Sequence, residues 1–192
     1  MSKYHDSNTT ASAPSGLSLN VAKLEKFKKN PSFIKRTFAN FRYPLDMLEE
    51  HLKLGDSRAA IVLQTYNTLI VAAYTDELDC IALLEFPVSF VEEHGLEVGD
   101  RLLTVNTYSK GRVIAADLEN GSDSYERYNN FHPLIADFLS DDEQAIESRK
   151  LEIEENEWIK TSKMGHQKLM IKGIIPRNGS PYESNIARKI RA

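Results

Sequence analysis

Residues 58–87 read RAAIVLQTYNTLIVAAYTDELDCIALLEFP, and residues 99–118 read GDRLLTVNTYSKGRVIAADL. These two stretches hold most of the apolar runs in the chain that have the length and composition of β-strands. Short polar breaks separate the runs, for example at residues 67–68 and 109–111, and breaks of this kind are typical of hairpin turns. We therefore predict an α+β fold: an antiparallel sheet or half-open small barrel over residues 59–118, flanked by N-terminal and C-terminal helices.

The run from Leu78 to Phe86 predicts the central strand of this sheet, because apolar side chains occupy most of both of its alternating faces. Cys80 lies in this run, which predicts a buried thiol. We expect the segment from Arg112 to Leu118 to return as the last strand of the hairpin that turns at residues 109–111. The polar segment 125–133 is expected to form a loop that leads into a short helix, Leu134 to Leu139.

Helices are predicted on both sides of the sheet from their end signals. Asn20 caps a helix that runs to Lys29, Ser32 caps a second, Pro44 begins a third that stops at Gly55, and Gly95 ends a short helix that starts at Val88. After the sheet, Ser140 and Glu143 form a capping-box pattern that predicts one long helix from Asp141 to about Lys163. An edge strand is expected within residues 167–175.

The composition is that of a globular protein, with 41% hydrophobic and 27% charged residues and no apolar run long enough to cross a membrane. We predict a disordered tail at residues 1–18, a single α+β domain at residues 19–175 and a basic, mobile tail at residues 176–192. The N-terminal sequence lacks the apolar core of a secretory signal, and the lone cysteine cannot form an internal disulfide. Both observations favour the cytoplasm.

The predicted helix 141–163 is rich in acids and carries few apolar residues, so it is weakly held by its own domain. Two interpretations stay open: a peripheral helix laid on the body, or a helix that binds a partner protein through apolar anchors steered by carboxylates. The predicted partner-binding residues are Leu151, Glu152, Glu154, Glu155 and Trp158. A second copy of the chain, giving a homodimer, is among the possible partners.

A second set of side chains is predicted to gather at one end of the sheet, where their types suit a phosphate or carboxylate ligand. The predicted ligand-binding residues are Asn106, Tyr108, Lys110, Arg112, Tyr125, Arg127 and His132. His132 is also a candidate general base, although a histidine before a proline more often bonds the nearby backbone. The five histidines are scattered, so no metal site and no cofactor are predicted.

The net charge of −4 is unevenly distributed, since residues 1–43 carry +6, residues 166–192 carry +5 and the middle carries −15. Basic ends favour a polyanion, so nucleic-acid binding is one candidate function. We rank three functions from the sequence. First comes a non-enzymatic binding protein (an adaptor, inhibitor or regulatory subunit), then a nucleic-acid binder. An enzyme whose site only the fold assembles ranks last, because no catalytic motif supports it.

Overall fold

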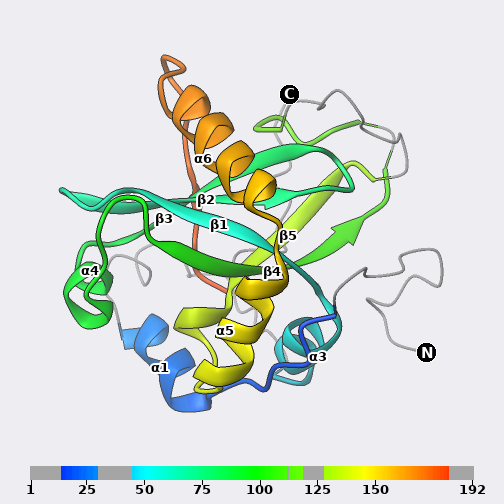
Figure 1. The fold of residues 1–192 in the computed structure, drawn as a ribbon, viewed down its shortest axis with the longest axis vertical. Helices are drawn as coiled ribbons and strands as arrows, with labels where there is room; N and C mark the ends of the chain where they lie inside the picture. The colour runs from blue at the N-terminus through cyan, green and yellow to red at the C-terminus, as the bar shows by residue number, and fades with distance from the viewer. Residues whose placement is uncertain (1–13, 30–44, 112, 119–127, 182–192) are drawn as a thin grey trace.

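The computed structural model describes residues 14–29, 45–111, 113–118 and 128–181 (Figure 1). These residues form a mixed, mostly antiparallel sheet in the strand order β5-β4-β1-β2-β3-β6, in which β6 alone runs parallel to its neighbour β3. The strands are β1 (Asp56–Gln64), β2 (Thr68–Thr75), β3 (Cys80–Pro87), β4 (Arg101–Ser109), β5 (Asn130–Ile135) and β6 (Arg177–Asn178). The predicted α+β class is confirmed, and the sheet is a curled half-barrel.

The curl of the sheet brings its two edge strands together through one side chain. Arg177 of β6 donates hydrogen bonds to the Phe131 carbonyl oxygen at 2.7 Å and to Asn130 Oδ1 at 2.8 Å, both on β5. The same guanidinium pairs with both carboxylate oxygens of Asp117. The backbone hydrogen-bond ladder does not close between β5 and β6. Arg177 instead links these two edge strands through side-chain hydrogen bonds, and this link fixes the curvature of the sheet.

Helices cover both sides of the curled sheet (Figure 1). They are α1 (Val21–Lys29), α3 (Leu45–Leu54), α4 (Ser89–His94), α5 (Glu143–Glu152) and α6 (Glu155–Leu169). The larger core joins buried side chains of the first four helices to the strands, whereas α6 packs on the opposite face over β1, β2 and β3. No helix in the described parts of the chain has the length and hydrophobicity to span a membrane.

Helix α6 lies close to the sheet because a glycine faces β2. A Cβ atom on Gly165 would come within 2.7 Å of the Ala72 Cβ atom, so only glycine permits this approach. The core under α6 is filled by apolar side chains that alternate along the strands, among them Ile61, Ala72 and Leu83, together with Trp158 of α6.

Several predicted helix ends are confirmed. Asn20 Oδ1 accepts hydrogen bonds from the backbone N–H groups of Ala22 and Lys23, at 2.7 and 3.0 Å, and so caps α1. Gly95 ends α4 with a φ of 62°, a left-handed conformation that glycine adopts without a steric cost. The predicted helix after Ser32 lies outside the described residues.

The last part of the predicted sheet is wrong. Residues 113–118, the described part of the predicted return strand, form no strand. The strand that pairs with β4 is β5, from the segment predicted to be a loop and the start of a helix. In the sequence Pro133 argues against a strand, because proline has no N–H group to donate to a neighbouring strand. However, β5 is an edge strand of the sheet, where such a residue is tolerated. Of the predicted helix Leu134 to Leu139, only a 3-10 turn at Ala136–Phe138 forms.

The predicted helix 141–163 is broken. Ile153 and Glu154 are extended, with ψ angles of 126° and 143°, so α5 and α6 are separate helices that meet at a corner. The N-cap is Asp142, whose carboxylate accepts from the Ala145 N–H at 3.0 Å, and not Ser140 of the predicted capping box. Ile153 packs against both cores, which explains why the chain changes direction at this residue.

The chain ends also differ from the prediction where they are described. The predicted edge strand within residues 167–175 is wrong, because α6 runs to Leu169 and β6 comes later. Part of the predicted N-terminal tail docks on the body: Leu17 is buried, and the N–H groups of Ser15 and Gly16 bond the Gly55 and Lys53 carbonyls. Residues 1–13 and 182–192 of the two predicted tails lie outside the described residues.

Candidate functional site

The corner between α5 and α6 holds a large apolar side chain in solvent. Leu151, in the last turn of α5, is 86% exposed. Glu152 and Glu154 follow it in the sequence and are exposed as well. An isolated exposed leucine is ordinary, but this one sits among carboxylates at a point where two helices meet. We call Leu151, Glu152 and Glu154 the acidic corner.

The corner is held in place by contacts on its inner side. Ile153, between Glu152 and Glu154, reaches into both cores. Immediately before the corner, the ammonium group of Lys150 lies 2.7 Å from Asp137 Oδ1. Burial opposes the charge of Lys150, but the carboxylate of Asp137 outweighs this effect and raises the lysine pKa. The acidic corner is therefore presented on a fixed backbone and not on a loop.

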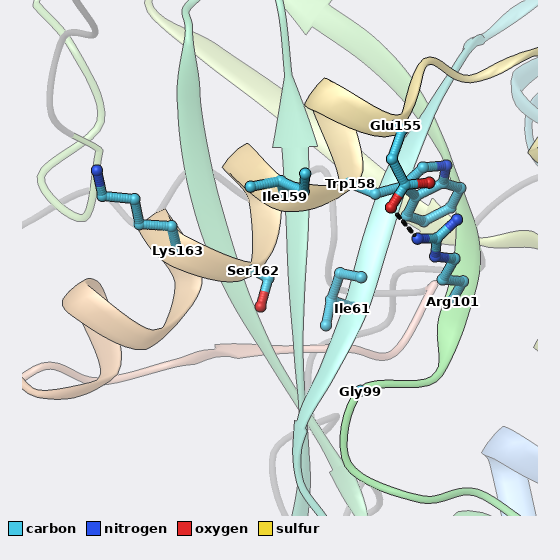
Figure 2. A pocket seen from close by; sticks show the side chains of 8 residues that line it. All are labelled: Ile61, Gly99, Arg101, Glu155, Trp158, Ile159, Ser162 and Lys163. Atoms are coloured by element: carbon cyan, nitrogen blue, oxygen red, sulfur yellow. Dashed lines mark hydrogen bonds and ion pairs between the residues drawn. The ribbon is translucent and has the colours of Figure 1, made fainter.

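Beside the corner, an open groove of about 430 Å³ runs between α6 and the start of β4 (Figure 2). It is lined by Ile61, Gly99, Arg101, Glu155, Trp158, Ile159, Ser162 and Lys163. The Arg101 guanidinium lies 5.0 Å from the centre of the Trp158 ring and pairs with Glu155. Ile159 is 59% exposed, so the groove has an apolar wall beside its charges.

The structure brings together four of the five predicted partner-binding residues. Leu151, Glu152, Glu154 and Glu155 are all exposed at or next to the acidic corner. Trp158 is different: only 2% of it is exposed, and it belongs to the core between α6 and the sheet. The expectation that its ring is offered to a partner is therefore wrong, because burial of its large apolar surface holds α6 on the sheet.

Arg101, Ile159 and Lys163 line the groove but were not predicted from the sequence as site residues. Arg101 comes from a different strand, and nothing in the local sequence places it beside α6. Ile159 and Lys163 could have been predicted from their spacing. Glu155, Ile159 and Lys163 follow one another at intervals of four residues and therefore share one face of a helix.

Under α6, another glutamate of the same helix faces inward. Glu157 Oε1 accepts a hydrogen bond from the Ala59 N–H at 2.8 Å, and its other oxygen pairs with Arg58. Arg58 also pairs with Asp56 and Asp76. Burial opposes the charge of Arg58, but the three carboxylates outweigh the effect of burial and raise the pKa of the arginine. For Glu157, burial is the larger effect and raises the pKa of its carboxyl group.

Two predicted ligand-binding residues belong to this buried network. The Asn106 side-chain amide donates to the Tyr74 carbonyl oxygen at 2.8 Å. The Tyr108 hydroxyl donates to Asp56 Oδ2 at 3.2 Å and accepts from Thr75 Oγ1 at 3.1 Å. Because these polar groups are buried and already bonded to neighbours, they hold the end of the sheet together and are not presented to a ligand.

The other predicted ligand-binding residues do not form one site. Lys110 lies in the exposed turn after β4, and Arg112, Tyr125 and Arg127 are outside the described residues. His132 lies in β5, where its Nε2 atom is 3.0 Å from Ser109 Oγ. A Ser–His pair is a starting point for covalent catalysis, but His132 is only 7% exposed, which leaves little room for a substrate beside its ring.

Among the described residues, no three side chains of His, Cys, Asp or Glu are grouped to hold a metal ion. Comparisons of the chain with protein-family models, with curated proteins and with solved structures find no match.

Proposed function

We propose that this protein is a non-enzymatic binding protein that docks a basic, apolar segment of a partner protein on the acidic corner and the adjoining groove. The observation that carries the proposal is the exposure of Leu151 next to the exposed carboxylates of Glu152 and Glu154, on a corner whose inner side is fixed in both cores. A preformed apolar contact beside exposed charge suits a docking surface, because ordering such a surface costs little on binding.

The charge around the corner indicates the kind of partner. Between Asp141 and Glu157 the sequence has eight acidic side chains and two basic ones. Some of these acids are used inside the molecule, as Glu157 is, but Glu154 enters no ion pair with a described residue. A surface of this sign attracts lysine- and arginine-rich segments and repels nucleic acid.

The cytoplasm is the compartment we propose for this function, since the lone cysteine cannot form an internal disulfide and Cys80 is buried with a pKa raised to about 12 by desolvation. A regulatory role, as adaptor, inhibitor or regulatory subunit, stays part of the proposal. Nucleic-acid binding through the basic ends is the competing prediction, and much of those ends lies outside the described residues.

Affinity capture with purified variants tests the proposal. The full chain carries a tag and is incubated with extract of its source cells, and the bound proteins are identified by mass spectrometry. We expect Leu151→Asp and the double change E152K/E154K to lose a protein that the wild type retains, because the first removes the apolar contact and the second reverses the field.

Leu45→Asp is the matched control, because Leu45 is also an exposed leucine but begins α3, away from the corner. Each variant is first checked for an unchanged thermal midpoint. A set of captured proteins, untagged copies of this chain included, that is the same for wild type, control and both corner variants would overturn the proposal. Capture that nuclease treatment abolishes would favour the nucleic-acid alternative.

A further inference from the structure

We infer that the partner is a second copy of this chain, and that two copies pair through α6 in antiparallel orientation about a two-fold axis at Ile159. The inference rests on the proposed function, since it names the occupant of the same surface. The surface involved is the outer face of α6, which the sheet does not cover (Figure 1).

The outer face of α6 is a continuous exposed stripe. Its members are Glu155, Ile159, Lys163, His166 and Met170, all exposed and spaced by three or four residues. Figure 2 shows the first three following one another along the helix beside the groove. Two large apolar side chains in this stripe, Ile159 and Met170, face solvent, so the stripe offers apolar area as well as charge.

The order of charges in the stripe is self-complementary. Glu155 precedes Ile159 by four residues and Lys163 follows it by four. When two such helices run antiparallel with Ile159 at the axis, Glu155 of each copy faces Lys163 of the other, and the two isoleucines meet. A two-fold axis requires a surface that matches itself in this way. Parallel pairing would instead place like charges together.

The two ends of α6 repeat the same complementarity. From Trp158 to Lys172 the chain has four lysines and no acid, whereas the acidic corner lies at the other end of the helix. Each end also carries an apolar side chain that is 86% exposed, Leu151 at the corner and Met170 at the basic end. Antiparallel pairing directs the basic end of one copy toward the acidic corner of the other, so opposite charges meet at both ends of the helix pair.

Lys163 is available for this contact. It is exposed, and it forms no ion pair or hydrogen bond with any residue that the structure describes. Glu155 already pairs with Arg101, and a lysine from the second copy would join that pair to form a small network. Such networks at the rim of an interface fix its register and speed its formation.

The size of the contact sets its strength. A single pair of helices covers less than the roughly 800 Å² per partner of a standard stable interface. We therefore expect a weak, concentration-dependent dimer with a dissociation constant in the micromolar range, which salt weakens further because opposite charges contribute to it.

Sedimentation velocity of the full chain across a concentration series tests the inference. We expect a monomer–dimer equilibrium in low salt that shifts to monomer in high salt. Ile159→Asp places two carboxylates at the axis and is expected to weaken the dimer at least about thirtyfold, as loss of a central contact does. Tyr66→Asp is the control, because Tyr66 is a large exposed side chain in the β1–β2 turn.

A charge exchange tests the antiparallel register. Glu155→Lys and Lys163→Glu are each expected to weaken the dimer about tenfold, and the double change E155K/K163E is expected to restore it, because the facing pair is then only inverted. In a separate variant, Ile159→Cys is expected to form a disulfide-linked dimer on mild oxidation, whereas Tyr66→Cys is not, and the buried Cys80 does not compete.

A chain that sediments as a monomer at every concentration overturns the inference, and so does a dimer that survives Ile159→Asp or that the double exchange fails to restore. These outcomes are separate from the fate of the proposed function. If the affinity capture then yields a different protein that the corner variants lose, the proposed function stands with another partner. If the affinity capture yields no such protein, both the inference and the proposed function are overturned.

Discussion

The inner and outer faces of α6 carry the same residue types, but the fold buries and bonds those side chains on one face and leaves them exposed on the other. On the inner face, Glu157 accepts a backbone N–H and pairs with Arg58, and the Trp158 ring is closed off from solvent. On the outer side, Ile159 is exposed, and so is Glu154 at the N-cap of α6. The difference teaches that a glutamate or a large apolar side chain in this helix is not by itself evidence of a binding site. What distinguishes the two faces is whether the fold already satisfies the group.

The largest expected effect belongs to the inner face. Trp158→Ala should lower the free energy of unfolding by about 3–5 kcal/mol, because it removes a large buried ring and leaves a cavity between α6 and the sheet. Leu83→Ala, in the same core, should cost about 2–5 kcal/mol. Urea unfolding followed by circular dichroism measures both. An unchanged midpoint for Trp158→Ala would mean that α6 is not packed on the sheet in solution.

A buried histidine predicts a pH dependence of stability. Desolvation lowers the pKa of His51 to about 3, and the charge of His132 acts in the same direction, whereas the Nε2–H donated to the Val105 carbonyl oxygen at 2.9 Å opposes the shift. The unfolded chain takes up a proton on this ring near pH 6.5 and the folded chain does not. The unfolded state therefore binds more protons between about pH 6.5 and 3, and stability falls as the pH is lowered through this window, by up to about 5 kcal/mol.

The contribution of His51 is isolated by comparing the wild type with His51→Gln, whose amide can still donate to the Val105 carbonyl. Free energies of unfolding measured at several pH values between 4 and 7 should give a smaller slope for the variant. Equal slopes in the two proteins would contradict the burial of a neutral His51.

A matched pair of glutamates sharpens the comparison between the two faces. Glu157→Ala should cost about 1–3 kcal/mol, because it leaves the buried Ala59 N–H without its acceptor. Glu154→Ala makes the same chemical change on the exposed side and should stay within about 0.5 kcal/mol of wild type. Thermal unfolding of the two variants side by side is the measurement. Equal costs would show that burial does not separate these two carboxylates.

The sequence was sufficient for the strands from residue 56 to 109, because hairpin breaks and alternating apolar residues are local signals. It was insufficient for β5 and β6. The segment around Phe131 is polar and contains a proline, and only its pairing with β4 makes it a strand. β6 is two residues long and is fixed through Arg177, which reaches groups more than forty positions earlier in the chain.

The candidate site was predicted in part for the same physical reason. Leu151 and its neighbouring glutamates lie within five positions of one another, so proximity in the sequence alone brought them together. Trp158 was misassigned because a sparse apolar stripe does not reveal which face of a helix a sheet will cover, and a break at Ile153 turns α6 relative to α5. Arg101 joins the groove only through the tertiary fold.

Photo-crosslinking from position 151 tests the central claim, that the acidic corner is a protein-docking surface, most directly. Benzoylphenylalanine replaces Leu151 in one variant and the exposed Tyr66 in another, and both are irradiated in extract of the source cells. The account predicts a covalent protein adduct, either a second copy or another protein, from position 151 and not from position 66. No adduct from position 151, or the same adducts from both positions, would contradict it.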